Sequence, residues 1–414
     1  MSTLLKSHLV SRIPLFLALI FITLPSLFTS FAEPANSPAA APSDADIFRD
    51  HAFELRLVPI GGSTSPNENA ALQQALQKFQ SATDQDDDSA IRKFLSDYPK
   101  SAWRPAILTN LGLKYRATGW FLKAMNAWEE AWASGENEKS AAGKAIIDRA
   151  VGELAELNAR LGRRTEVEQI LKQVQDRTFI GAATEKITAA REGIYLMKAE
   201  PGNAFKCGPY ALGQICIAQH RTVDTWDKIA EAQSTDHGTS LDQVWRLSNE
   251  LGMNLQMAKR ATGSPIMVPS VVNWKASHYA ALIRQENGKY LIQDPTFGGD
   301  IWVTQAALDA ESSGYFLVQN GPLPIGWESV GSSEAAKIWG MGAATDHDQT
   351  GDKTIDLKCK PGCSSGGMAT YNFHTQLVSL NITDSPLKYK PAFGPEVTFT
   401  LTYNQREAYD PPIT

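Results

Sequence analysis

The stretch that decides the fold is NAFKCGPYALG, Asn203–Gly213. Before it, Pro201–Gly202 interrupts any preceding helix, and Cys207–Pro209 is typical of a turn that places a proline at an early helical position. Apolar residues then recur at helical spacing as far as Ala218. We therefore expect a helix that begins at Cys207, where the unpaired N–H groups and the positive end of the helix dipole favour a thiolate.

A histidine and an aspartate follow on a predicted β-hairpin. The segment NWKASHYAALIRQENGKYLIQDPTFGGDIWV predicts two strands, the first beginning at His278 and the second ending at Asp294. If both side chains meet Cys207, the cysteine is a nucleophile and His278 takes its proton and later protonates the leaving amine. Asp294 would fix the imidazole tautomer. The pattern indicates a Cys-His-Asp triad.

The turn between the strands, His278–Gln285 and Lys289–Asp294, decides whether the histidine and the aspartate can meet. A two-residue turn at Asn287–Gly288 would place them on opposite faces of the sheet. A three-residue loop, Glu286–Gly288, with the glycine in a G1 bulge makes them diagonal neighbours on one face, about 7 Å apart at the backbone. We predict the bulged loop.

KCGPYALGQI, SHYAALI, YLIQDPTFGG and SGYFLV resemble the papain-like peptidases that process bacteriocin leader peptides, over about Glu200–Val318. The resemblance implies an α+β domain, a peptide or protein substrate, and three catalytic residues: Cys207, His278 and Asp294. Lys206 replaces the aspartate that usually precedes the cysteine. Pro201 stands where the family's oxyanion glutamine is expected, which makes Asn203, the nearest amide, the candidate substitute.

Composition and the N-terminus indicate an exported protein. The chain has 414 residues, a net charge of −6 and 43% hydrophobic residues, so it can hold several domains, and nucleic-acid binding is not expected as its main activity. Lys6 and Arg12 precede the apolar run Ile13–Leu24, and Ser30–Ala32 is a small-x-small cleavage signal. This pattern predicts a bacterial signal peptide and a secreted or cell-envelope location, with membrane contact only through an uncleaved N-terminal segment.

The region before the cysteine is helical throughout. LTNLGLKYRATGWFLKAMNAWEEAW, Leu108–Trp132, spaces small and large residues as a tetratricopeptide helix pair does, and weaker copies lie at Ser89–Pro99 and Ala145–Val174. We expect about three units stacked as one helical domain. Such a domain either binds a peptide or partner along its concave side or acts as a spacer, and both alternatives stay open.

The C-terminal part changes character. Met368–Tyr403 alternates as strands do and resembles the entry into the β-shell of RHS/YD-repeat proteins, which implies the front end of a longer protein or a fragment. Asp346–Asp356 spaces its acids like a calcium loop, but Leu357 stands where a bidentate acid is required. We expect no cofactor and no metal.

The four cysteines fall into two pairs. Cys207 and Cys216 share the predicted helix, about 13.5 Å apart, which is too far for a disulfide, so Cys207 should be free. Cys359 and Cys363 flank a turn and either form a disulfide or stay as two thiols.

Together these patterns predict a multidomain chain: all-α tetratricopeptide-like helical repeats, then an α+β papain-like cysteine peptidase domain and a short β-rich C-terminal segment. The expected parts are a signal peptide (1–32), a Pro/Ala/Ser-rich linker (33–68), the helical domain (69–198), the peptidase domain (199–320), a second linker (321–367) and an incomplete RHS-like segment (368–414).

The function predicted is that of an exported cysteine endopeptidase, with its own longer chain as one candidate substrate. The family cuts after double glycine, and this chain has two candidate pairs, Gly366–Gly367 and Gly61–Gly62. The family also requires an apolar residue four positions before the cut, where this chain has Ser364 and Pro59, respectively. Two alternatives remain. Pro201 favours a peptidase-shaped module that binds a peptide without cutting it. A transglutaminase-like acyl transferase would use the same three residue types.

Overall fold

The computed structural model describes residues 41–220, 224–297, 299–342, 370–374, 379–389 and 397–404. Several sequence predictions lie outside these residues: the signal peptide, the acidic loop at 346–356, the Cys359–Cys363 pair and the Gly366–Gly367 site. Within the described ranges, every helix is too short or too polar to cross a membrane.

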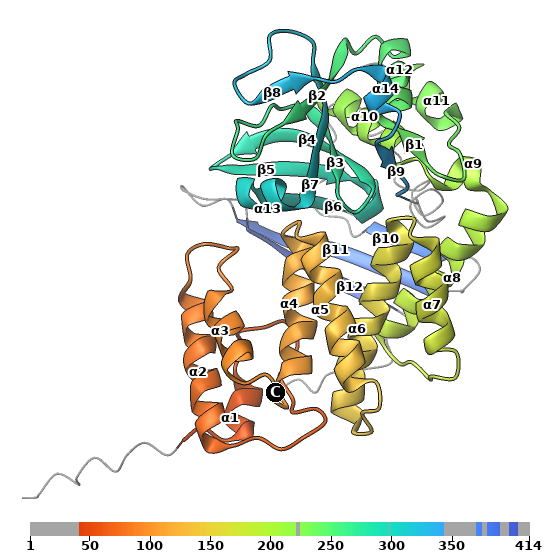
Figure 1. Cartoon of the computed structure of the whole chain (residues 1–414). Helices are drawn as coiled ribbons and strands as arrows, with labels where there is room; N and C mark the ends of the chain where they lie inside the picture. Colours follow the sequence, from red (N-terminus) through yellow and green to blue (C-terminus); the bar gives the residue numbers. More distant parts are fainter. Residues whose placement is uncertain are drawn as a thin grey trace, which may run out of the picture. The chain divides into compact units, whose positions relative to one another are not determined.

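The N-terminal part of the described chain consists of helices, with a long connection between α1 and α2 and mostly shorter ones after it (Figure 1). They are α1 (Asp44–Arg49), α2 (Pro66–Ser81), α3 (Ser89–Asp97), α4 (Arg104–Ala117), α5 (Phe121–Gly135), α6 (Ala141–Arg160), α7 (Arg164–Gln173) and α8 (Ala182–Ala199). Ser43, Ser65 and Ser140 begin three of them by accepting a backbone N–H of the first turn. The predicted helical region is confirmed, while its tetratricopeptide character stays a prediction.

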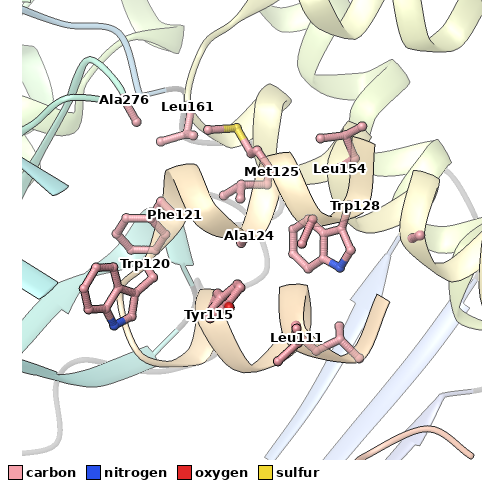
Figure 2. Packing of buried hydrophobic residues seen from close by; sticks show 14 of the residues in the cluster. Leu111, Tyr115, Trp120, Phe121, Ala124, Met125, Trp128, Leu154, Leu161 and Ala276 are labelled. Carbon is pink, nitrogen blue, oxygen red and sulfur yellow. The ribbon is translucent and has the colours of Figure 1, made fainter. Parts of the chain in front are cut away.

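Large aromatic residues on α5 pack against small residues on α4. A Cβ atom added to Gly112 would lie 2.2 Å from Nε1 of Trp128, so only glycine leaves room for the indole. That indole donates to the carbonyl oxygen of Thr109 at 3.1 Å. Figure 2 shows Trp128 and Phe121 in one cluster with Leu154 of α6.

The second part is a mixed region built on a seven-stranded sheet, with a separate two-stranded sheet of β1 and β9. Its elements are α9 (Pro201–Ala204), α10 (Cys207–Ala218), α11 (Asp224–Glu231), β1 (Thr239–Ser240), α12 (Leu241–Glu250), β2 (Leu255–Arg260), β3 (Ser270–Trp274), β4 (His278–Glu286), β5 (Lys289–Asp294), η1 (Pro295–Phe297), β6 (Gly299–Thr304), α13 (Gln305–Glu311), β7 (Ser312–Gln319), β8 (Trp327–Ser329), α14 (Ser332–Ala335) and β9 (Trp339–Gly340). The seven-stranded sheet has the order β6-β5-β4-β3-β7-β2-β8 with antiparallel neighbours.

The two faces of this sheet pack against different partners, because side chains alternate along each strand. Tyr279 and Ala281 of β4 belong to the cluster that contains α10 and α12. Ala280 and Leu282 belong to the cluster shared with α4, α5 and α6. The sheet therefore lies between the helix that begins at Cys207 and the N-terminal helices.

The β4–β5 hairpin corrects the predicted turn. Glu286 pairs with Lys289, and Asn287 and Gly288 both have positive φ (49° and 76°), so the turn has two residues and not the predicted three. The extra residue lies inside β4, where the register shifts between Leu282 and Arg284. This internal bulge brings His278 and Asp294 to one face of the sheet. The sequence predicts instead that a bulge in the loop does so.

Both predicted linkers contain regular structure. Helix α1 lies within 33–68, where Leu57 and Ile60 are also buried. Strand β8 extends the sheet within 321–367, and β9 pairs with β1. Elements this short leave too little periodicity in the sequence to be recognised.

The described C-terminal residues form a three-stranded antiparallel sheet: β10 (Thr370–His374), β11 (Ser379–Tyr389) and β12 (Val397–Asn404). The resemblance to RHS proteins stays a prediction.

Direct contacts join the N-terminal helices to the peptidase-like region. Phe121 stacks on Phe297 with ring centroids 4.4 Å apart and meets Trp274 edge-on at 5.2 Å. The carboxylate of Glu311 accepts the N–H of Leu122 at 2.9 Å, which satisfies an otherwise unpaired donor in the first turn of α5. Ala276, from the turn before β4, and Leu161, which follows α6, belong to the same buried cluster (Figure 2).

Gly119→Ala tests this junction. Gly119 has φ +82°, and a Cβ atom there would lie 2.4 Å from Cγ1 of Val303 on β6. The matched control is Gly263→Ala, since Gly263 has φ +81° and nothing within 4 Å of an added Cβ. Both changes should cost roughly 1–2 kcal/mol for the left-handed backbone, and Gly119→Ala a further 1–3 kcal/mol, roughly, for overpacking. Equal free energies of unfolding in denaturant titrations would contradict the junction.

Candidate active site

Cys207 lies at the first position of α10, as the sequence predicts. Its side chain is free of any disulfide and only 2% exposed. The first N–H groups of a helix lack intrahelical acceptors, and Pro209 has no N–H, so the N–H groups of Cys207 and Gly208 are donors without an intrahelical acceptor in the first turn of α10. This end of the helix favours a negative charge.

His278 and Asp294 form a buried pair next to this helix. The imidazole Nε2 contacts Oδ2 of Asp294 at the end of β5, and His278 is fully buried. Nδ1, the other ring nitrogen, has no hydrogen-bond partner among the described residues. A Cβ atom added to Gly342 would contact both this Nδ1 and Cβ of Cys207, so the imidazole and the thiol border the same point. The structure thus brings Cys207, His278 and Asp294 together.

The pair has a strong electrostatic preference for the imidazolium. Burial alone would lower the pKa of His278, but the negative charges of Asp294 and Cys207 raise it to about 10. An imidazolium facing a cysteine is the arrangement in which a thiolate can attack and its partner can supply the proton that the leaving group needs.

Residues around Asp294 hold its carboxylate in place. Oδ1 accepts the N–H of Thr296 at 2.9 Å, while Oδ2 is used by His278. The carbonyl of Thr296 accepts a hydrogen bond from Nη1 of Arg160, the last residue of α6. Phe297 places its ring edge-on to the imidazole, 5.1 Å away, while stacking on Phe121. The N-terminal helices therefore reach the triad through η1.

Arg160 is itself fixed by a buried ionic cluster formed by residues of α4, α6 and α8. Its Nη2 lies 3.0 Å from Oε1 of Glu156, whose other oxygen lies 2.7 Å from Nζ of Lys186 and 3.2 Å from Nη1 of Arg116. Burial alone would raise the pKa of Glu156, but Arg160, Lys186 and Arg116 hold it well below its usual range. An ionised Glu156 keeps Arg160 aimed at Thr296.

The position expected to bind the oxyanion lacks the side-chain donor that the sequence predicts. Pro201 begins α9 and offers no donor. Asn203, the predicted substitute, is exposed, and its Nδ2 donates to Oε2 of Glu200 at 3.2 Å. The structure therefore does not turn the Asn203 amide toward the buried thiol. Lys206 is buried, and its Nζ donates to the carbonyl of Ala230 at 2.8 Å.

Residues 202–321 match the model of the Peptidase C39 family. This part of the chain is thus a C39 peptidase domain of the bacteriocin-processing type, which implies a cysteine-type peptidase. One similar solved structure is the crystal structure of a double glycine motif protease from an AMS/PCAT transporter in complex with the leader peptide. It is 19% identical, covers 28% of this chain and 84% of that chain, and has a TM-score of 0.22. None of the curated proteins matches the chain.

Several residues of the site carry no signal in the sequence. Arg160 and Thr296 are 136 residues apart, so no local spacing announces their contact. Phe121 is noticeable only as a packing residue of the helices. Gly340 borders Cys207, and Gly342 borders Cys207 and His278; both glycines come from a stretch whose serines and glycines indicate a linker. Tertiary packing determines all these contacts.

The buried pair of His278 and Asp294 predicts a pH dependence of stability. The folded chain binds the His278 proton more tightly than the unfolded chain does. The contribution of this proton to the free energy of unfolding is therefore complete below pH 6.5 and is lost as the pH rises through about 10. Wild type should lose stability over this window, measured against His278→Gln by denaturant titration at each pH. Cys207→Ala removes one of the negative charges that raise the pKa of His278. The stabilisation should therefore be lost at a lower pH in this variant than in wild type.

The control is His51→Gln, which changes an exposed histidine outside the buried pair. Identical pH profiles for wild type and His278→Gln would contradict the buried ion pair.

Proposed function

We propose that the chain is an exported cysteine endopeptidase that hydrolyses peptide bonds with Cys207, His278 and Asp294, and that its own chain is a substrate. The observation that carries this proposal is the buried His278–Asp294 pair beside a cysteine at a helix start, within the region that matches the C39 family. Export rests on the N-terminal signal-peptide pattern.

The geometry supports a two-step mechanism. The Cys207 thiolate attacks the carbonyl carbon of the scissile bond, and the imidazolium of His278 gives its Nδ1 proton to the leaving amine. The neutral imidazole then removes a proton from water, the resulting hydroxide attacks the thioester, and the thiolate leaves. Asp294 stays ionised throughout, keeping Nε2 protonated and stabilising the imidazolium each time it forms.

Backbone N–H groups take the role that the missing glutamine leaves open. Negative charge develops on the carbonyl oxygen during both attacks, and the N–H groups of Cys207 and Gly208 at the start of α10 lack an intrahelical acceptor. One lost side-chain donor costs about 10²–10³-fold in rate where it has been removed from other hydrolases. We therefore expect a slow peptidase, as suits an enzyme that acts on its own chain.

Two variants test the proposed chemistry. Cys207→Ala should abolish hydrolysis of an unstructured protein such as casein, because it removes the nucleophile. Asp294→Asn should lower the rate about 10²–10⁴-fold, because His278 loses the charge that supports its proton transfers. Fragment formation followed by mass spectrometry measures both effects. Equal activity of Cys207→Ala and wild type would rule out the mechanism.

Arg160 is a positioning residue, and its variant separates positioning from stability. Arg160→Met should free the carbonyl of Thr296 and displace Asp294, with a loss of about tenfold to hundredfold in rate. The alkaline limb of the pH–rate profile should also move to lower pH, since His278 loses a fixed partner. The control is Arg163→Met, because Arg163 contacts Glu166 and Met125 and not η1. A uniform loss of rate with an unmoved pH profile would mean that Arg160 has only a structural role.

A further inference from the structure

A short segment that follows the C39 region lies over Cys207 and His278. The family match ends at residue 321, and this covering segment is Ile338–Gly342. Two of its residues form β9, which pairs antiparallel with β1. The N–H of Met341 adds a hydrogen bond to the carbonyl of Ser277 at 2.7 Å. The covering segment is thus bound as an added strand, which is a recurring mode of peptide recognition.

Two glycines bring the backbone of the covering segment against the thiol and the imidazole. A Cβ atom added to Gly340 would lie 3.1 Å from Sγ of Cys207, and one added to Gly342 would lie 1.9 Å from Nδ1 of His278. Because a carbon–carbon single bond is about 1.5 Å long, the two Cα atoms lie within about 4.6 Å of the sulfur and about 3.4 Å of the nitrogen, respectively. A substrate carbonyl must come within about 3–3.5 Å of the sulfur to react. The covering segment and a substrate therefore cannot occupy this place together.

The covering segment also leaves the site closed to solvent. Cys207, His278 and Asp294 are 2%, 0% and 5% exposed, respectively. A peptide from outside can reach these side chains only after the covering segment has left.

The first two carbonyl groups of the covering segment are directed away from the start of α10, where the N–H groups without intrahelical acceptors would bind an oxyanion. The oxygen of Ile338 accepts the N–H of Leu241 and the hydroxyl of Tyr279, both at 2.8 Å. The oxygen of Trp339 accepts Nδ2 of Asn273 at 3.1 Å. Both carbonyl groups are therefore held by the surrounding residues.

The next two carbonyl groups also lie against residues outside α10. A Cβ atom added to Gly238 would lie 2.0 Å from the oxygen of Gly340. One added to Gly162, in the turn after α6, would lie 1.7 Å from the oxygen of Met341. The covering segment thus fills the substrate's place without presenting a bond for attack, as an inhibitor does and a substrate does not.

We propose that the covering segment is an inhibitor built into the chain, which keeps the peptidase closed until a peptide takes its place. This inference rests on the proposed function, because only an active peptidase can be inhibited. Such competition lowers the apparent affinity for a substrate by the fraction of molecules in which the site is open. The chemistry of the triad stays the same. Displacement of the covering segment should therefore raise kcat/KM and leave kcat unchanged.

Gly340→Val in the full chain tests this inference. Gly340 has no positive φ, so its backbone accepts a valine, but a Cβ atom there would lie 2.3 Å from Cδ2 of Tyr279, which is fully buried in β4. The covering segment, which is held by a few hydrogen bonds, should yield to this overpacking before the central strand does. The variant should hydrolyse casein with kcat/KM raised about tenfold or more over wild type and with the same kcat.

Gly331→Val is the matched control, since nothing lies within 4 Å of an added Cβ atom there, and it should keep the kcat/KM of wild type. Cys207→Ala in each background shows which hydrolysis belongs to the site. Cys207-dependent hydrolysis with kcat/KM in Gly340→Val at or below that of wild type overturns the inference alone. The absence of Cys207-dependent hydrolysis from both wild type and Gly340→Val overturns the proposed function and the inference with it.

A synthetic peptide of residues 336–343, AKIWGMGA, gives a second test. A tethered segment acts at an effective concentration on the order of millimolar, so the free peptide is added in that range. It should inhibit casein hydrolysis by Gly340→Val competitively and stay uncut, whereas the same peptide with valine in place of Gly340 should not inhibit. Should Gly340→Val fail to fold, wild type is assayed with the same two peptides. Equal rates with either peptide, or cleavage of the first, overturn the inference.

Discussion

The arrangement of this protein depends on keeping a charged imidazole and a carboxylate together in a place that water does not reach. His278 is fully buried and contacts Asp294, and removing such charges from water costs several kcal/mol per ion unless partners compensate. Compensation comes from Thr296, which donates its N–H to Asp294, and from the negative charge of Cys207. A Cys-His-Asp site of this kind persists only if its surroundings fix all three groups.

The N-terminal helices supply much of that fixation. Arg160 holds the carbonyl of Thr296, Phe121 stacks on Phe297 beside the imidazole, and Gly162 makes room for the backbone of Met341. These contacts come from α5, the end of α6 and the turn that follows it. The helices therefore form part of the wall around Cys207, His278 and Asp294.

The sequence predicts the elements of the site better than their supports. Cys207 at a helix start and the two strands that carry His278 and Asp294 follow from local periodicity and turn chemistry. The shared face of the hairpin was predicted correctly from the wrong turn, because the bulge lies within β4, between Leu282 and Arg284. Such a bulge depends on how the strand packs, which local sequence does not encode. The two-residue strand β9 is too short for any periodicity, so its place beside Cys207 could only come from the structure.

The most direct measurement is the titration of the His278 imidazole itself by NMR, with the ring carbon labelled. The account predicts that His278 keeps its proton to a pKa of about 10 in wild type and releases it at lower pH in Asp294→Asn. An imidazole that titrates near 6.5 in wild type, or whose pKa does not change when Asp294 is neutralised, would contradict a preformed ion pair at the site.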